Sequence, residues 1–336
     1  MHARLLYTAL ATDITVNNAL LNMYGNCGGV EDAEKMFENM SECDSVSWNV
    51  LLSVYNLHGR TTQLVNKMLS RGYMPDIITW TSWLTSCAEE ADLTEGKKVH
   101  TSVNNSGHTI DTVVRIALIS LYGRCGDLET ARKMFHSLET QTPVSWNAMI
   151  AVYAQHGLGQ EALNTFKQML IENVKPDEIT FTSVLAACSH DGLLLEGCLI
   201  FSLTIGNNAT SPSADHFSCI IDLLGRIGRL DEAENLINAL PIEDVTSLYF
   251  LALLGSCRYQ NDVERGERAA QQAFELDSEI PASYVLLSNL YVHANYDTTI
   301  SNKDDEDGER FVFPYFGFIL DSIDYNFMIF LVLSFG

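Results

Sequence analysis

The sequence predicts an all-α protein, an α-solenoid in which helix-turn-helix repeats stack into a right-handed superhelix. Ser-Val-Ser-Trp-Asn begins at Ser45, and Pro-Val-Ser-Trp-Asn begins at Pro143, 98 residues later. A shorter period of 31 to 36 residues lies between such landmarks, and periods of this length are typical of stacked supersecondary units. Hydrophobic residues make up 47% of the 336 residues, with only seven prolines, which suits many short buried helices. We expect about eight helical hairpins from roughly Thr12 to Asn295.

Turn signals divide the chain into successive units. Residues 1–12 form a partial unit, because the first helix of their hairpin is missing from the sequence. Complete units are expected at 13–44, 45–76, 77–111, 112–142, 143–177, 178–215 and 216–243, followed by a helical extension at 244–297 and a divergent tail at 298–336. In unit 143–177, Trp146, Ile150 and Tyr153 lie at helical spacing. Gly157 then ends this first helix as a left-handed cap.

Two segments depart from the repeat pattern. Segment 45–76 is three residues shorter than its equivalent, 143–177, and the shortfall comes after Gly59. We therefore expect its second helix to be short or distorted. The tail from Phe311 to Gly336 is apolar, but Pro314 and two aspartates interrupt it, and its clean runs are shorter than a membrane span requires. We expect residues 1–12 and 298–336 to be poorly packed, the tail to be disordered, and the chain to have no membrane partner.

These motifs resemble those of the plant pentatricopeptide repeat proteins, in the subclass whose repeats cycle through long, short and standard types. The similar segments are VSWNAMIAVYAQHGLGQEALNTFKQMLIENVKPD from Val144 (standard), ITFTSVLAACSHDGLLLEG from Ile179 (long), RIALISLYGRCGDLETARKMF from Arg115 (short) and HFSCIIDLLGRIGRLDEAENLINALP from His216 (final short). ALLGSCRYQNDVERGERAAQQAFELD from Ala252 and ASYVLLSNLYVHANYD from Ala282 resemble a truncated E-type extension. The competing solenoid family, the tetratricopeptide repeats, has a Trp, Leu-Gly and Tyr signature that is absent here.

The resemblance implies sequence-specific binding of single-stranded RNA, with one repeat for one base. In the family, the fifth residue of a repeat and its last residue choose the base. The corresponding pairs are Asn18 with Asp44, Asn49 with Asp76, Thr81 with Asp111, Ile116 with Thr142, Asn147 with Asp177, and Thr182 with Asp215, and Ser218 is the fifth residue of the next repeat.

The side chains in these pairs differ in what they can read. Asn offers a donor and an acceptor, and an Asp can fix its orientation. By the resemblance, Asn with Asp favours a pyrimidine, usually uracil, and Thr with Asp favours guanine, although that rule is weak in long repeats. Ile116 cannot form hydrogen bonds, so its repeat should be a spacer or a steric contact. Taken singly, each polar residue is equally compatible with helix capping and turn chemistry.

Catalytic chemistry is not expected. No His-x-Glu and no Cys-x-x-Cys occurs, so the zinc signature of the family's DYW deaminase domain is absent from this sequence. There is also no Gly-rich phosphate loop and no Gly-x-Ser-x-Gly. We expect no enzyme activity, no cofactor, no metal and no small-molecule substrate. The eight cysteines are expected to be buried, reduced thiols in a reducing compartment.

The predicted function is that of a specificity factor in organellar RNA processing, namely C-to-U editing, with a deaminase-bearing partner supplied in trans through the E-like region. The resemblance implies a mitochondrion or a chloroplast, although the sequence carries no recognisable transit peptide. A net charge of -23 opposes long-range attraction to RNA. The charge favours the alternative of a protein-interaction scaffold that uses the concave groove of the helical repeats. A truncated, non-functional gene product is a further alternative.

Overall fold

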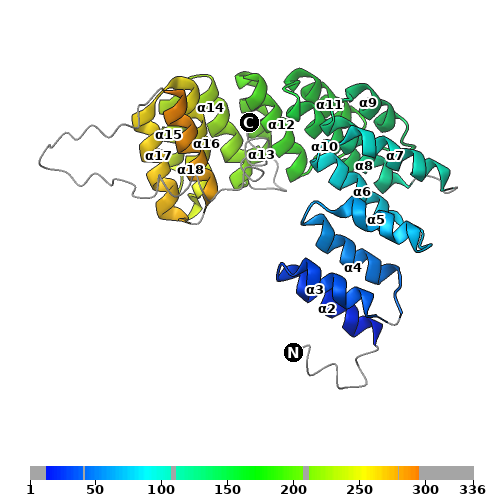
Figure 1. Ribbon diagram of the computed structural model, residues 1–336. Helices are drawn as coiled ribbons and strands as arrows, with labels where there is room; N and C mark the ends of the chain where they lie inside the picture. Colours follow the sequence, from blue (N-terminus) through cyan, green and yellow to red (C-terminus); the bar gives the residue numbers. More distant parts are fainter. Residues whose placement is uncertain (1–12, 41, 107–110, 207–211, 279, 295–336) are drawn as a thin grey trace, which may run out of the picture. The chain divides into compact units, whose positions relative to one another are not determined.

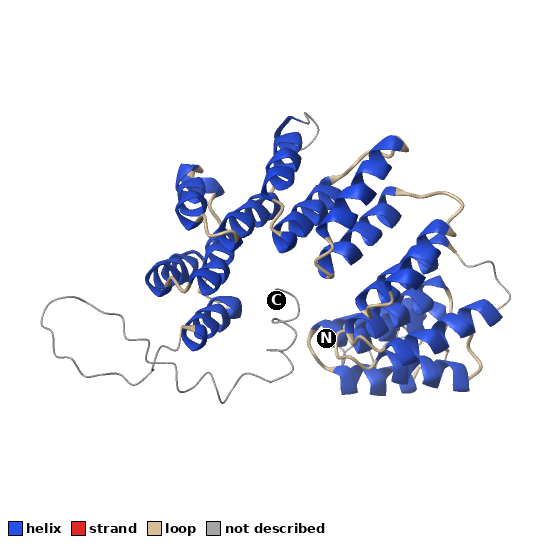
Figure 2. Cartoon of the chain, turned by 90° about the horizontal axis from the view of Figure 1, so that it is seen from above, coloured by secondary structure: helices blue, strands red, loops and turns tan. Residues whose placement is uncertain are grey.

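All regular structure in the described residues is helical (Figure 2). The computed structural model describes residues 13–40, 42–106, 111–206, 212–278 and 280–294. Within them, helices form eight successive hairpins followed by one further helix, so the predicted all-α solenoid is confirmed. The expected poor packing of 1–12 and 298–336 concerns residues that lie outside this part of the chain. The chain divides into two compact units, Met1–Ser183 and Val184–Gly336.

The first unit contains five complete hairpins (Figure 1). Their first helices contact one another in order, and each also contacts the second helix of its own hairpin. The hairpins are α2 (Ile14–Asn26) with α3 (Val30–Glu38), α4 (Ser45–Asn56) with α5 (Thr61–Ser70), α6 (Ile77–Glu89) with α7 (Leu93–Asn105), α8 (Thr112–Arg124) with α9 (Leu128–His136), and α10 (Pro143–Gln155) with α11 (Gly159–Ile171). Helix α12 (Glu178–Asp191) begins in this unit and ends in the next.

The second unit continues the same pattern. Helices α14, α16 and α18 contact one another in order, and α14 and α16 each contact their second helix. The elements are α13 (Leu194–Gly206), α14 (Ala214–Arg226), α15 (Leu230–Ala239), the 3₁₀ turn η2 (Ile242–Asp244), α16 (Ser247–Gln260), α17 (Val263–Leu276) and α18 (Pro281–His293). Among the described helices, none combines the length and the apolar character needed to cross a bilayer.

The repetition seen in the sequence is also present in the packing. Trp48 packs edge-to-face on Phe37 with ring centroids 4.6 Å apart, and Trp146 packs in the same way on Phe135 at 4.8 Å. A Cβ added to Gly123 would lie 2.1 Å from the Val152 side chain, and one added to the equivalent Gly25 would lie 2.2 Å from the side chain of Val54. Glycine therefore allows neighbouring first helices to approach closely at both places.

Glycines in the left-handed conformation end first helices, as predicted for Gly157. Gly157 has φ +63°, and its equivalent Gly59 has φ +64°. Only glycine adopts this left-handed conformation without steric cost. The prediction for the shortened segment is also confirmed: α5 has 10 residues where α11 has 13.

The cysteine prediction is only partly correct. All eight cysteines are free, and Cys87 and its repeat equivalent Cys188 are buried. Cys27, at the C-cap of α2, and Cys198 are exposed, and Cys43, Cys125 and Cys219 are half-buried. Burial raises the pKa of Cys87 and of Cys188 to about 12, which keeps both thiols protonated at neutral pH.

Candidate functional site

The last residue of a repeat also begins the next first helix. Asp76 is the N-cap of α6, where its carboxylate accepts the backbone N–H of Thr79 at 2.8 Å. The other carboxylate oxygen accepts a hydrogen bond from Nδ2 of Asn49, on α4, at 2.8 Å. The Thr79 hydroxyl lies 3.2 Å from Oδ1 of Asn49 and 2.9 Å from Oδ1 of Asp76. One capping residue therefore ties two neighbouring repeats together.

The same arrangement recurs in a tighter form, with Asn147 98 residues after Asn49, and with Asp177 and Thr180 101 residues after Asp76 and Thr79. Asn147, on α10, is only 6% exposed, and its Nδ2 donates to the two carboxylate oxygens of Asp177 at 2.9 and 3.2 Å. The Thr180 hydroxyl donates to Oδ1 of Asn147 at 2.6 Å and lies 2.8 Å from Oδ1 of Asp177. The Thr180 backbone N–H donates to Asp177 at 2.8 Å. We refer to these two groups as the Asn49 cluster and the Asn147 cluster, each consisting of an Asn, an Asp and a Thr.

Hydrogen bonds keep both carboxylates ionised. Burial alone would raise the pKa of Asp177, but the Thr180 N–H, the Thr180 hydroxyl and the Asn147 amide together hold it below its ordinary value. Burial acts in the same direction on Asp76, and the Thr79 N–H, the Asn49 amide and the Thr79 hydroxyl again bring its pKa below the ordinary value. An ionised carboxylate can only accept hydrogen bonds. It therefore requires the Nδ2 side of the amide to face it.

The first pair is held differently. Asp44 caps α4, and the Ser47 backbone N–H donates to its carboxylate at 2.8 Å. This N–H, followed by the hydroxyl of Ser47 and the side chain of Asn18, lowers the pKa of Asp44. The Ser47 hydroxyl lies 2.9 Å from the Asp44 carboxylate. Oδ1 of Asn18 is buried and has no hydrogen-bond partner among the described protein groups.

The threonine pairs are not joined in this way. The Thr81 hydroxyl donates to the backbone carbonyls of its own helix, at Ile77 and Ile78, 2.9 and 3.0 Å away. Asp111 caps α8 by accepting the Val113 N–H at 2.8 Å. The Thr182 hydroxyl likewise donates to a carbonyl of its own helix, that of Glu178, at 3.0 Å.

The Ile116 repeat has an N-cap but no polar side chain at its fifth position. Thr142 is the N-cap of α10 and accepts the Ser145 N–H at 3.4 Å. Ile116 is half-buried on α8. Its hydrocarbon side chain can form no hydrogen bond, so it cannot contact the Thr142 hydroxyl as Asn147 contacts Asp177.

The expected position of Asp215 requires a correction. Helix α14 begins at Ala214, so Ser213 is its N-cap and Asp215 lies in the first turn. The Ser213 N–H donates to Nδ1 of His216 at 3.0 Å, which completes a capping box. Ser213 therefore occupies the place that Asp177 occupies one repeat earlier. Ser218 is five residues after this N-cap, like Asn147 after Thr142, and its hydroxyl donates to the Ala214 carbonyl at 2.9 Å.

A row of exposed apolar residues accompanies the clusters, and the sequence analysis did not identify it. Each member lies two residues after an N-cap and three before a fifth-position residue, so it shares a helix face with the latter. The members in the first unit are Val46, Ile78, Val113, Val144 and Ile179, which are 55%, 56%, 55%, 60% and 63% exposed. The detectable signal is a β-branched residue at this fixed offset, where solvent exposure would favour a polar one.

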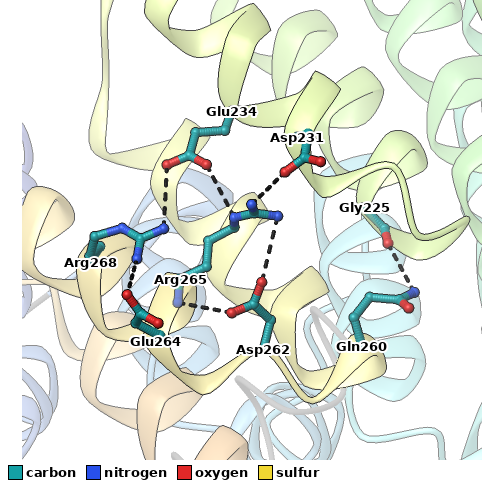
Figure 3. Close-up of polar contacts among 8 residues, drawn as sticks. All are labelled: Gly225, Asp231, Glu234, Gln260, Asp262, Glu264, Arg265 and Arg268. Atoms are coloured by element: carbon teal, nitrogen blue, oxygen red, sulfur yellow. Dashed lines mark hydrogen bonds and ion pairs between the residues drawn. The ribbon is translucent and has the colours of Figure 1, made fainter.

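The arginines of the second unit that the structure describes are all engaged. Each described arginine of this unit, which has no lysine in 184–294, pairs with a carboxylate or a tyrosine ring. Arg265, whose side chain is 16% exposed, lies 2.5 Å from Asp231 and 3.1 Å from Glu234 (Figure 3). Arg268 lies 3.1 Å from Glu264. Arg226 and Arg229 pair with Asp222 and Glu232, and Arg258 lies over the Tyr259 ring.

Metal chemistry finds no support in the described residues. Within 13–40, 42–106, 111–206, 212–278 and 280–294, no group of three or more His, Cys, Asp or Glu side chains lies close enough to hold a metal ion. The polar clusters consist of amide, carboxylate and hydroxyl groups bonded to one another. Such groups can recognise a planar partner by hydrogen bonds.

Comparison with known proteins gives consistent matches along the chain. The PPR repeat profile matches residues 18–45, 116–141 and 215–241, the PPR repeat family profile matches 141–190, and the E motif profile matches 260–302. A chloroplastic pentatricopeptide repeat-containing protein of Arabidopsis thaliana is 36% identical over 88% of this chain and 35% of its own length. A putative mitochondrial one from the same plant is 35% identical over 87% of this chain and 47% of its own. The chain thus spans about a third to a half of the length of these relatives.

Among solved structures, the chain is similar to the pentatricopeptide repeat protein PPR10 in complex with an 18-nt psaJ RNA element. The TM-score is 0.66 and the identity 18%, over 87% of this chain and 44% of that one. The free form of PPR10 from maize gives a TM-score of 0.52 at 16% identity, over 86% of this chain and 50% of that one. At this level of identity the likeness concerns the fold.

Proposed function

Because the chain belongs to the pentatricopeptide repeat family, we propose that it binds single-stranded RNA with sequence specificity and directs RNA processing in an organelle. The observation that carries this proposal is the Asn147 cluster. Its amide is held in one orientation and lies beside an exposed apolar residue on the same helix face. Single-stranded RNA offers both an edge for the amide and a flat face for the apolar side chain.

Each repeat then contributes two kinds of contact. The fifth-position side chain forms hydrogen bonds to a base edge, and Val144, three residues before Asn147, presents an apolar surface for the base face. An aromatic base stacked on protein side chains is held without regard to its identity. Base identity is set by the hydrogen bonds, because a base whose edge does not match the amide leaves the amide without hydrogen-bond partners. Asn49 and Asn147, each in an intact cluster, are the strongest candidates for this role.

The charge determines how such binding would depend on salt. With a net charge of -23 and with the described arginines of the second unit engaged by carboxylates or a tyrosine ring, the protein can neutralise few phosphates. For single strands, the logarithm of the binding constant falls by about 0.7 per phosphate contact per decade of salt. We therefore expect a shallow salt dependence and modest affinity. Binding would depend mainly on the bases.

Selection from a random single-stranded RNA pool, followed by sequencing of the bound fraction, tests this function. We expect a short motif in which the nucleotide at the Asn147 repeat is a pyrimidine. Asn147→Thr should shift that nucleotide towards guanine, whereas Ile116→Ala should leave the preference at its own repeat nearly unchanged. Enrichment of no motif by the wild-type chain, or an equal response to both substitutions, would overturn the one-repeat, one-base proposal.

The organelle and the processing step form the finer part of the proposal. The E motif match at 260–302 and the organellar names of the relatives support C-to-U editing in a chloroplast or mitochondrion, with the deaminase carried by a partner protein. Sequencing of organellar transcripts after loss of the gene tests this, because at least one cytidine should then remain unconverted. If all edited sites persist and a transcript end or intron is lost instead, the protein acts in another processing step.

The second candidate is a scaffold that binds a peptide on the helix face that carries the Asn49 and Asn147 clusters. The acidity favours it, since the described arginines of the second unit are all engaged and the surface would attract a basic segment. The selection experiment separates the two candidates. A scaffold would enrich no RNA motif and would bind basic peptides with strong salt dependence.

A further inference from the structure

The hydroxyl at the third position after an N-cap contacts the reading amide of the preceding repeat, and this contact varies along the chain. We propose that Thr180 is a specificity-determining positioning residue for the repeat before its own, because its hydroxyl fixes the Asn147 amide in one orientation. The inference rests on the proposed RNA function, since the orientation affects specificity only if the amide meets a base.

The hydrogen-bond inventory of the amide is the first argument. Nδ2 of Asn147 has two protons, and one side of it faces the Asp177 carboxylate at 2.9 and 3.2 Å. Oδ1 has two lone pairs, and one receives the Thr180 hydroxyl at 2.6 Å. A flipped amide would place Oδ1 against the carboxylate and would lose the bond from the hydroxyl. The two partners therefore favour the same orientation from opposite ends of the amide.

The Thr180 hydroxyl is itself held in place. It accepts the Asp177 backbone N–H at 3.1 Å, and its own proton is directed between Oδ1 of Asn147 at 2.6 Å and the Asp177 carboxylate at 2.8 Å. Thr180 is completely buried, and its branched Cβ restricts χ1. The donor is thus positioned before any ligand arrives, which reduces the ordering cost of binding.

Comparison between repeats is the second argument. In the Asn49 cluster the equivalent hydroxyl contact, from Thr79, is longer, at 3.2 Å. In the first pair the residue at this place is Ser47, whose hydroxyl keeps its 2.9 Å contact with Asp44, while Oδ1 of Asn18 has no partner among the described groups. The hold on the amide therefore weakens from Asn147 to Asn49 to Asn18, although all three pairs have the same two reading residues.

The fixed orientation of the amide affects the choice between uracil and cytosine. Uracil presents an N–H at ring position 3, where cytosine presents a bare nitrogen, so the two bases require opposite groups from the protein. With Nδ2 and Oδ1 each half engaged, one N–H and one lone pair remain in fixed places for the base. An amide free to flip would satisfy either pyrimidine. We expect discrimination between uracil and cytosine to be greatest at Asn147 and least at Asn18.

Substitution of Thr180 tests the proposal in the full chain. Thr180→Val keeps the shape and removes the hydroxyl, and Thr180→Ser restores it. Ser145→Ala is the matched control, because Ser145 is the buried third-position residue of α10 and follows the Ile116 repeat, which has no amide to position. Selection from a random RNA pool measures uracil-over-cytosine preference at each nucleotide, and Asn147→Ala identifies the nucleotide that faces Asn147.

We expect Thr180→Val to reduce the uracil-over-cytosine ratio at that nucleotide by about fivefold, the equivalent of one net hydrogen bond. Thr180→Ser should restore most of the ratio, and Ser145→Ala should leave the preference at every nucleotide unchanged. The positioning role is refuted if Thr180→Val lowers total affinity without changing the ratio, since lost helix capping alone would produce that result.

A measurement without RNA separates this proposal from the proposed function. In ¹⁵N-labelled protein, the Asn147 side-chain NH₂ should exchange slowly with solvent, and Thr180→Val should accelerate its exchange where Ser145→Ala does not. If the wild-type chain enriches no RNA and this difference is present, the RNA function is wrong and the positioning contact stands. If the exchange rate of Asn147 is the same in both variants, the positioning proposal is wrong whatever the protein binds.

Discussion

Asp177 contacts both sides of a repeat boundary, so replacing it with alanine removes two kinds of interaction together. Its carboxylate accepts the Thr180 N–H at 2.8 Å, which caps α12, and the Asn147 amide at 2.9 Å. Loss of an N-cap costs about 1 kcal/mol. Asn147 is 6% exposed, and a buried amide deprived of its acceptor costs about 1–3 kcal/mol more. We expect Asp177→Ala to lower the free energy of unfolding by about 2–4 kcal/mol.

Asp111 provides the matched comparison. It is exposed, and it caps α8 through a single 2.8 Å bond from Val113 without a partner from the preceding repeat. Asp111→Ala should therefore cost only the cap, about 1 kcal/mol. Urea denaturation of both variants at pH 7, followed by far-ultraviolet circular dichroism, gives the two free energies. The reasoning is refuted if Asp177→Ala costs no more than Asp111→Ala.

Three further predictions concern stability. Gly123→Ala should cost about 1–3 kcal/mol of unfolding free energy, because its Cβ would meet a side chain of the next first helix at 2.1 Å. Gly255→Ala, whose Cβ would meet nothing within 4 Å, should instead stabilise α16 by about 0.5–1 kcal/mol. Thermal denaturation of both variants checks that the two effects have opposite signs. Arg265→Ala should destabilise more than Arg268→Ala in urea titrations, since the side chains are 16% and 53% exposed and exposed ion pairs contribute only about 0–1 kcal/mol. The Asp177 pKa is lowered on folding, so the stability that Asp177 confers should be complete above about pH 5 and disappear as the pH falls through the folded-state pKa; a wild-type advantage over Asp177→Ala that grows on acidification would contradict this.

The repeat register in the sequence was sufficient to predict the hairpins and to pair Asn49 with Asp76 and Asn147 with Asp177, while the base-reading role of these pairs stays a proposal. Asn49 with Asp76 and Asn147 with Asp177 lie in contact because the chain repeats at a constant interval, and equal intervals bring equal positions together. The short second helix α5 followed from the same counting. These features depend on spacing along the chain, which the sequence states directly.

The remaining features depend on local geometry that spacing does not contain. Asp215 was placed two residues late, because the capping pair Ser213 and His216 sets the start of α14 at Ala214. Thr81 was paired with Asp111, but a threonine hydroxyl within a helix competes for the carbonyls of its own turn. The Thr180 contact depends on a rotamer, which no count of residues supplies.

The repeat-ending residue is also the N-cap of the helix that follows it, and this limits which residues can be introduced at that position. At five repeat boundaries this position is Asp44, Asp76, Asp111, Thr142 and Ser213, and each is the N-cap of a first helix. Asp177, immediately before α12, accepts the Thr180 N–H in the same way. Ser, Thr, Asp and Asn are the side chains that cap well, and exchanging one for a non-capping residue costs about 1 kcal/mol. Replacing this residue by longer, non-capping side chains in several repeats would accumulate that cost at each one. The set of side chains that this position tolerates is thus limited by the need to cap the helix that follows it.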